Sequence, residues 1–389
     1  MRLGIDASNL RAGGGITHLV ELLRVADPLR LGFSQVIVWG GQPLLNRIED
    51  RPWLVKSCQP LLDRSLPYRT FWQRFRLSRL ARMAGCDVLF VPGGSYAGNF
   101  HPMVTMSRNM LPFEWRELLR YGCSWTGFRL MILRWTQSRT FRRADGLVFL
   151  TQYAREEVMR VVKAAAGRTA LIPHGIDNRF ANPPREQLPI SQFSLERPFC
   201  ILYVSIIDEY KHQWHVAEAI AQLRASDLPV VLDLVGAAYP PALKRLKVVL
   251  ERLDPAGTFV RYLGPIPHDD LPGRYSEADA CLYASSCENM PNILMEGMAS
   301  GLPIACSNRG PMPEVLRDGG VFFDPEDPED IARALRELID SPELRARLAQ
   351  ASFERAQSYS WQGCARETFK FLAEVSRSHV SKPAVPVHS

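Results

Sequence analysis

Paired cysteines and zinc-binding motifs are absent from this 389-residue sequence. Its eight cysteines are scattered, with no C-x-x-C pair and no metal-ligand spacing, and its eight histidines form no cluster with them. This pattern predicts reduced, mostly buried thiols in a cytoplasmic protein and no bound metal.

Long apolar runs are missing as well. No stretch of 18 apolar residues occurs, so a transmembrane helix is not expected. The first seven residues, Met1 to Ala7, are typical of a β-strand and lack the apolar core of a signal peptide. No G-x-G-x-x-G follows a predicted strand, and no acidic residue stands where a dinucleotide ribose needs one, which disfavours a nicotinamide dehydrogenase.

What the sequence does contain is a regular alternation of short apolar segments with helical ones. Hydrophobic residues make up 46% and charged residues 23%, as in a folded protein of about two domains. The alternation predicts the α/β class with parallel sheets. The predicted strands are Arg2–Asp6, Gln35–Trp39, Asp87–Val91, Met103–Met106, Gly146–Leu150 and Thr169–Ile172, then Phe199–Ser205, Val230–Val235, Phe259–Leu263, Ala280–Tyr283, Pro303–Cys306 and Gly320–Phe323.

A proline-rich polar stretch that begins at Phe180 predicts a linker between the domains. We therefore expect an N-terminal Rossmann-like domain over 1–182 and a second one over 183–360. A helix over 361–377 is expected to pack back towards the N-terminal domain, and residues 378–389 are expected to form a disordered tail. Two such domains place a ligand at the carboxyl ends of the strands, in an interdomain cleft.

Positive charge is concentrated in one region. Residues 61–145 hold 14 arginines, no lysine and 5 acidic residues, a net charge of +9 in a chain whose total is +6. Aromatic residues are interleaved with these arginines, as in Trp125-Thr-Gly-Phe-Arg-Leu-Met-Ile-Leu-Arg-Trp135. This composition suits an anionic membrane surface, while a solvated helix face explains it equally simply. No nucleic-acid motif accompanies it.

The most specific motif is Glu288-Asn-Met-Pro-Asn-Ile-Leu-Met-Glu296, in which two carboxylates bracket a predicted helix start at Pro291. A helix N-terminus offers free N–H groups to phosphate. A carboxylate on each side can accept hydrogen bonds from sugar hydroxyls. The motif therefore suits a nucleotide-sugar, although two surface glutamates on an amphipathic helix are the simpler interpretation of the pair alone.

Five further blocks accompany this motif in order. They are Tyr203-Val-Ser-Ile-Ile-Asp-Glu-Tyr-Lys211, Leu263-Gly-Pro-Ile-Pro, Leu271-Pro-Gly-Arg-Tyr-Ser-Glu-Ala-Asp279, Gly297-Met-Ala-Ser-Gly-Leu-Pro-Ile304 and Met312-Pro-Glu-Val. Together they resemble the retaining nucleotide-sugar glycosyltransferases of family four, which have the GT-B fold of two facing Rossmann-like domains. The resemblance covers about 165 residues of the second half. The first half agrees more loosely, through Gly13-Gly-Gly-Ile16 and Ile172-Pro-His-Gly-Ile-Asp177.

The resemblance implies a role for each matching residue. Glu288 would contact the donor sugar and Lys211 would neutralise the diphosphate, so both are the predicted catalytic residues. Glu296 would accept hydrogen bonds from the ribose. The remaining predicted nucleotide-sugar-binding residues are the loop Asn289, Met290, Pro291, Asn292 and Ile293, the glycines Gly13, Gly14 and Gly15, and Ser107, Arg108 and Asn109.

Three positions depart from the family pattern. Ile206 stands where an arginine commonly shares the phosphate charge, and Arg108 or Arg309 are candidates to replace it. No histidine follows the strand at 103–106, so Ser107, Arg108 and Asn109 are expected to line the sugar site instead. Gly297 replaces a common alanine, which we expect to be a harmless packing change.

The expected function is a metal-independent, retaining hexosyltransferase that needs no cofactor besides its nucleotide-diphosphate sugar. Its expected acceptor is a glycan or lipid-linked molecule of surface polysaccharide or lipopolysaccharide assembly, at the inner face of the plasma membrane. A non-catalytic nucleotide-sugar-binding scaffold or sensor with the same fold is the alternative. His174 fits a structural loop residue, and His212 could either reach phosphate or lie exposed.

Overall fold

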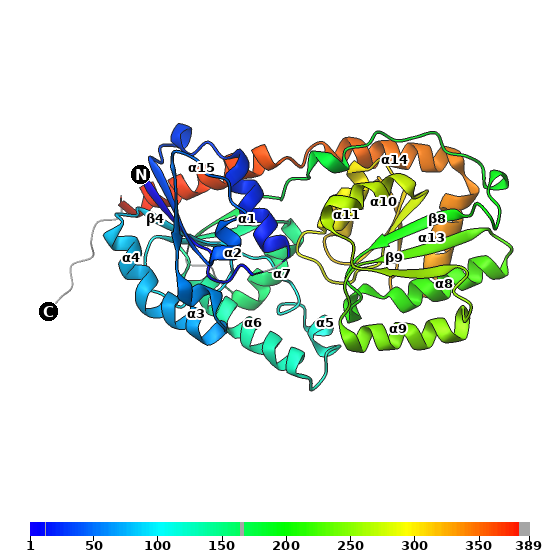
Figure 1. Ribbon diagram of the computed structural model, residues 1–389, viewed down its shortest axis with the longest axis horizontal. Coiled ribbons are helices and arrows are strands. Elements are labelled where there is room, and N and C mark those ends of the chain that lie inside the picture. Colours follow the sequence, from blue (N-terminus) through cyan, green and yellow to red (C-terminus); the bar gives the residue numbers. More distant parts are fainter. Residues whose placement is uncertain (12, 164–166, 381–389) are drawn as a thin grey trace. The chain divides into compact units, whose positions relative to one another are not determined.

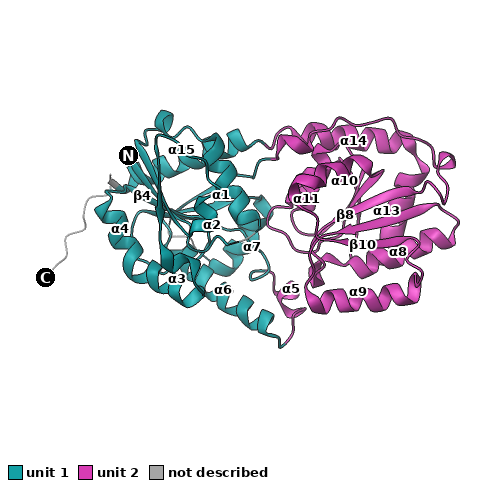
Figure 2. Cartoon of the chain, in the orientation of Figure 1, with its two compact units in different colours: residues 1–113, 123–175, 360–389 teal, residues 114–122, 176–359 magenta. Residues whose placement is uncertain are grey.

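The computed structural model describes residues 1–11, 13–163 and 167–380, and the chain forms two compact units (Figures 1 and 2). Unit 1 comprises residues 1–113, 123–175 and 360–389, and unit 2 comprises residues 114–122 and 176–359. The predicted boundary after residue 182 lies a few residues beyond the observed one. The short segment 114–122 belongs to unit 2, although it lies in sequence within the predicted first domain.

The core of unit 1 is a parallel sheet of seven strands in the order β3-β2-β1-β4-β5-β6-β7. The central strands are buried along their length, because helices cover both faces of such a sheet. Their continuous apolar runs are what made them predictable. The strands are β1 (Arg2–Asp6), β2 (Gln35–Gly40), β3 (Leu54–Cys58), β4 (Val88–Val91), β5 (Met103–Met106), β6 (Gly146–Phe149) and β7 (Arg168–Leu171).

Strand β3 is the one strand of this sheet that the sequence pattern missed. Its residues Leu-Val-Lys-Ser-Cys are only partly buried or exposed, and it pairs with a neighbour on one side alone. An edge strand of this kind needs no apolar run, so its sequence resembles a loop. The other predicted strands of both units lie within a residue or two of the observed bounds.

Unit 1 is completed by helices α1 (Gly14–Val25), α2 (Gln42–Leu45), α3 (Leu66–Trp72), α4 (Ser78–Met83), α6 (Trp125–Arg143), α7 (Gln152–Val162) and α15 (Trp361–Val380). It also contains the short 3-10 helices η1 (Leu29–Leu31) and η2 (Pro60–Asp63) and the π-helical segment η3 (Gln73–Leu77), which joins α3 to α4. The C-terminal helix α15 packs against α1 and β4, and the ring of Phe369 contacts that of Phe33. This helix runs to Val380, so the predicted tail from Ser378 begins inside it. Residues 381–389 lie outside the described residues.

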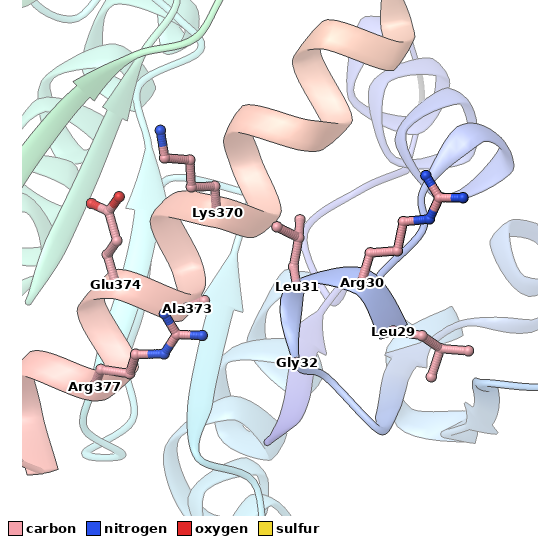
Figure 3. Close-up of a pocket in the computed structure, with 8 residues that line it drawn as sticks. All are labelled: Leu29, Arg30, Leu31, Gly32, Lys370, Ala373, Glu374 and Arg377. Carbon is pink, nitrogen blue, oxygen red and sulfur yellow. The ribbon is translucent and has the colours of Figure 1, made fainter.

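A shallow pocket marks the contact between η1 and α15 (Figure 3). Lys370, Glu374 and Arg377 extend from the helix, whereas Arg30 points away from it. None of the residues predicted to bind a nucleotide-sugar lines this pocket. Its position fits a packing seam between the two ends of the chain rather than a substrate site.

Unit 2 is built on a six-stranded parallel sheet in the order β10-β9-β8-β11-β12-β13. Its strands are β8 (Phe199–Val204), β9 (Val230–Val235), β10 (Val260–Gly264), β11 (Ala280–Tyr283), β12 (Ile304–Ser307) and β13 (Val321–Phe323). Its helices are α5 (Trp115–Leu119), α8 (Gln213–Ala225), α9 (Pro240–Leu253), α10 (Leu271–Glu277), α11 (Asn292–Ala299), α12 (Met312–Leu316), α13 (Pro328–Asp340) and α14 (Pro342–Ala356), with turns η4 (Asn178–Phe180), η5 (Ile190–Gln192), η6 (Glu209–Lys211) and η7 (His268–Asp270).

The neighbouring strands β8 and β11 form the centre of this sheet. The chain leaves β8 towards β9 on one side and leaves β11 towards β12 on the other. This reversal is the topological switch point of an open α/β sheet, where ligands bind at the carboxyl ends of the strands. The loops that carry Lys211 and Glu288 begin at these two strand ends.

No helix in the described ranges is both long enough and apolar enough to cross a membrane.

Candidate functional site

Lys211 and Glu288, the two predicted catalytic residues, contact each other in unit 2. Lys211 is only 5% exposed, and its Nζ pairs with Glu288 Oε1 and donates to the Tyr283 hydroxyl at 3.0 Å. The same carboxylate oxygen accepts hydrogen bonds from the hydroxyls of Tyr283 at 2.6 Å and Ser285 at 2.9 Å. Breaking a buried pair of this kind leaves one uncompensated charge and costs about 3–5 kcal/mol.

Aromatic rings enclose the lysine. Its Nζ lies 5.0 Å from the ring centroid of Tyr210 and 4.9 Å from that of Tyr283, within the range of cation–π attraction. Burial, reinforced by the charge of Glu288, raises the pKa of both tyrosines well above the usual range. Both hydroxyls therefore stay protonated, and that of Tyr283 donates to the carboxylate.

The loop that carries Lys211 is fastened to the loop that carries Glu288. The Tyr203 hydroxyl donates to the Lys211 carbonyl at 2.8 Å, and the Ser286 N–H donates to the Tyr210 carbonyl at 2.9 Å. His212 is fully buried with a left-handed φ of 53°, and its Nε2 lies 2.9 Å from Ser286 Oγ. Burial lowers the pKa of His212 to about 2. His212 is therefore not exposed, which corrects one of the two alternatives that the sequence left open, and its Nε2 is already bonded within unit 2.

The loop 289–293 leads into α11, whose first residue is Asn292. Pro291, the predicted helix start, occupies the N-cap, so the helix begins one residue later than predicted, and no side chain caps this end. Asn289 and Met290 are buried. The start of α11 therefore has backbone N–H groups that no side chain caps.

Glu296 lies in the second turn of α11 and is only 9% exposed. Its Oε1 is 3.2 Å from His268 Nε2, and the Tyr275 hydroxyl lies 3.5 Å from its Oε2. Burial raises the pKa of Glu296, and the contact with the carboxylate raises the pKa of His268. Neither His268 nor Tyr275 was predicted as a neighbour of this residue, because they come from a separate turn and helix.

Gly297 follows Glu296 in α11, at a place where there is little room for a side chain. A Cβ at this position would lie 3.0 Å from Cys281 Sγ, closer than side chains normally approach. An alanine would therefore require Cys281 to shift. The departure from the family pattern is a packing feature, as expected, but one that is coupled to Cys281.

The three predicted glycines, Gly13 to Gly15, lie at the start of α1. Gly13 is the N-cap with a φ of 65°, which glycine adopts without strain, and no side chain caps the helix. A Cβ on Gly15 would lie 2.6 Å from Arg108 Nη1. The absence of a side chain at Gly15 thus lets the guanidinium lie against the positive end of the helix.

Arg108 follows β5 and is the least compensated of the predicted cations. Among the described residues it forms no hydrogen bond or ion pair, and its Nε is buried without a partner. Burial lowers its pKa to about 10. Burial and the positive end of the helix both disfavour a cation at this place, so the charge of Arg108 is poorly compensated within unit 1.

The other predicted residues are placed differently. Ser107 is fully buried, and Asn109 Oδ1 accepts the Leu111 N–H at 3.1 Å and so shapes its own turn. Arg309 forms an ion pair with Asp324, with Nη2 2.5 Å from Oδ2. Ile206 is exposed. Of the two candidates to replace the missing arginine, Arg309 already has a carboxylate partner and Arg108 has none.

Sequence reasoning missed a stack of rings in unit 1. His18, His174 and Trp361 are buried, with centroids 4.8 Å apart for the two histidines and 5.6 Å apart for His174 and Trp361. Burial lowers the pKa of His18 well below its usual range. The structural role predicted for His174 is consistent with this packing, since its turn touches the start of α15. No sequence signal links three residues so far apart.

In the described part of the chain, no group of three or more His, Cys, Asp or Glu residues is arranged to hold a metal ion. All eight cysteines are free thiols, four of them buried.

Comparison with known proteins identifies a glycosyltransferase domain in each half of the chain. Residues 12–180 match the Glycosyltransferase Family 4 domain, and residues 185–355 match the Glycosyl transferases group 1 domain. The O-antigen chain mannosyltransferase B of Escherichia coli is 26% identical over 227 residues, which are 57% of this chain and 58% of that protein. The match thus spans little more than half of that relative's length.

Solved structures share the whole fold. Sucrose-phosphate synthase from Thermosynechococcus elongatus superposes with a TM-score of 0.73 at 18% identity, over 98% of this chain and 99% of that one. HepE from Anabaena, solved in complex with UDP, gives 0.65 at 18% identity, over 98% and 100%. At this identity the likeness shows the fold alone, and it confirms the predicted GT-B class with two Rossmann-like parallel sheets.

Proposed function

Because the chain belongs to the glycosyltransferases that pair a family 4 domain with a group 1 domain, we propose that it transfers a hexose from a nucleotide-diphosphate sugar with retention of configuration and without a metal. The proposed acceptor is a glycan or lipid-linked molecule of bacterial-type surface polysaccharide or lipopolysaccharide assembly. The observation that carries the proposal is the buried Lys211–Glu288 pair at the switch point of unit 2.

The reaction develops charges of both signs that the site has to stabilise. Cleavage of the anomeric C–O bond places negative charge on the leaving diphosphate and positive charge on the sugar carbon. Lys211 and the uncapped start of α11 can stabilise the diphosphate, which is the main task of such a site. When Lys211 turns to the phosphates, Glu288 keeps its hydrogen bonds from Tyr283 and Ser285 and gains capacity for a sugar hydroxyl. Glu296 would accept hydrogen bonds from the ribose, and the acceptor would attack from the leaving-group face.

Arg108 is proposed to supply the phosphate charge that is missing at Ile206. Its guanidinium has no partner in the described residues and lies against the start of α1, so binding an anion would relieve a charge that is otherwise uncompensated. Gly13–Gly15 would offer their backbone to the same group, with Ser107 and Asn109 nearby in sequence.

Thermal-shift binding against GDP, UDP, dTDP, ADP, CMP and NAD tests the proposal. We expect one nucleoside diphosphate to raise the melting temperature, since a ligand at 100 times its dissociation constant adds about 2.7 kcal/mol of stability. Replacing Arg108 with alanine should weaken that response, whereas Arg336→Ala on α13 should not. A response to NAD alone, or to none of the six, would contradict the proposal.

We further propose that α6 binds an anionic membrane surface on the cytoplasmic side. Its exposed apolar residues recur at helical spacing, and the outermost are Trp125 at 76% and Trp135 at 67% exposure. Phe128 and Ile132 continue the same stripe, with Arg129 beside it. An apolar stripe with a cationic rim is the surface of an interfacial helix.

Vesicle co-sedimentation tests this surface. The protein should bind phosphatidylglycerol–phosphatidylcholine vesicles and leave them at about 1 M salt, where the Debye length falls to about 3 Å. Trp125→Ser with Trp135→Ser should lower the affinity at least ~10-fold, since burying one large apolar side chain contributes about 1.5–3 kcal/mol. Leu195→Ser with Val248→Ser, also exposed but in unit 2, is the control. Equal binding by both double variants would overturn the assignment.

A further inference from the structure

The segment 114–122, between β5 and α6 in sequence, belongs to unit 2 (Figure 2), and it contacts the loop that carries Lys211. Tyr121 is buried near its end, and its hydroxyl donates to Asp208 Oδ1 at 2.9 Å. The same Asp208 oxygen accepts the Glu209 N–H at 2.8 Å and so caps η6. The Asp208 carbonyl accepts the Lys211 N–H at 3.0 Å. One hydroxyl from a distant segment thus reaches the turn that ends in Lys211.

Several other contacts hold the segment in place. Arg120 and Arg116 both form ion pairs with Glu326, and Arg120 Nε also binds the buried Glu117 at 2.7 Å. The Tyr121 ring packs at 5.9 Å from that of Tyr239. Because these contacts do not use the Tyr121 hydroxyl, removing that hydroxyl leaves the segment attached.

We propose that Tyr121 is a positioning residue for Lys211, acting through Asp208 and the cap of η6. The proposal rests on the proposed function, because it assigns Lys211 to the donor diphosphate. Without the hydroxyl, the Asp208 side chain loses a buried donor and can rotate towards other partners. The cap of η6 then loosens, and the lysine Nζ departs from the position in which it meets the leaving group.

The reason that this contact affects the rate is geometric. A catalytic charge stabilises the leaving group only when it is held at the right place, and a side chain on a short turn takes its position from the cap of that turn. The contact joins residues 87 positions apart, so nothing local substitutes for it.

The test compares kcat in four variants with a saturating nucleotide-sugar donor. Tyr121→Phe should lower kcat about 10-fold, the size of one lost hydrogen bond to a charged group. Asp208→Ala should lower it at least as much, and the double variant should be no slower than Asp208→Ala, because both changes remove one interaction. Arg116→Gln, in the same segment, should keep the wild-type kcat.

The same change made in a Lys211→Met protein distinguishes a positioning role of Tyr121 from a general loss of structure. In Lys211→Met, Tyr121→Phe should cause no further fall in the residual rate, because the group that it positions is gone. The inference is overturned if the Tyr121→Phe variant turns over as fast as the wild type. It is also overturned if Tyr121→Phe lowers the rate of the wild-type protein and of the Lys211→Met protein by the same factor. Should Lys211→Met itself react at the wild-type rate, the proposed function of the site fails instead, whatever Tyr121→Phe does.

Discussion

Replacement of Lys211 by alanine is expected to lower the rate of sugar transfer at least ~100-fold, because removing one partner of the developing oxyanion charge has an effect of that size. In the structure this lysine is buried and paired with Glu288. Its loss leaves the carboxylate with hydroxyl partners only, so the same variant should also unfold at lower denaturant concentration. Initial rates and denaturant unfolding on the same preparation measure both effects.

Two further variants accompany this experiment. Lys211→Met keeps the apolar stem between Tyr210 and Tyr283 and removes only the charge, so its rate should fall as far as that of the alanine variant. Lys247→Ala, an exposed lysine of α9, should transfer at the wild-type rate. A Lys211→Ala protein that stays folded and reacts at the wild-type rate would remove Lys211 from the site.

The second large effect is expected at Glu288. Glu288→Ala should also lower transfer at least ~100-fold, since the proposed contact of this carboxylate is with the donor sugar during the reaction. The expected effect of Glu288→Ala on nucleotide binding differs from that of Lys211→Ala. Affinity for the nucleoside diphosphate, measured by calorimetry, should change little, because that ligand carries no sugar beyond the ribose.

The Glu288→Gln variant separates the charge of this residue from its capacity to accept hydrogen bonds. Glutamine keeps an oxygen that can accept from Tyr283 and Ser285 but has no charge to pair with Lys211. An intermediate rate is expected, and Glu277→Ala, an exposed glutamate of α10, should be unaffected. If Glu288→Ala weakens nucleoside diphosphate binding as strongly as Lys211→Ala does, the residue acts on the phosphates and its assignment to the sugar is wrong.

The positions of the buried strands and of the motifs at their ends were readable from the sequence. Strand β11 is a four-residue apolar segment, and the polar loop after it carries Glu288. A buried parallel strand is mostly apolar, and the chain becomes polar where it leaves the sheet, so the order of elements and the edge that carries the site follow from local composition. The edge strand β3 lacked that signal and was missed.

The pairing of particular side chains was decided only by the tertiary structure. Lys211 and Glu288 are 77 residues apart, and Tyr121 and Asp208 are 87 apart. Composition alone made Arg108 and Arg309 equal candidates, yet folding gives Arg309 a carboxylate and leaves Arg108 without a partner among the described residues. Local sequence determines which segments become buried strands, because burial needs only apolar residues in a row. Which charge is neutralised depends on where distant loops meet, and that is settled when the sheet has brought their strands together.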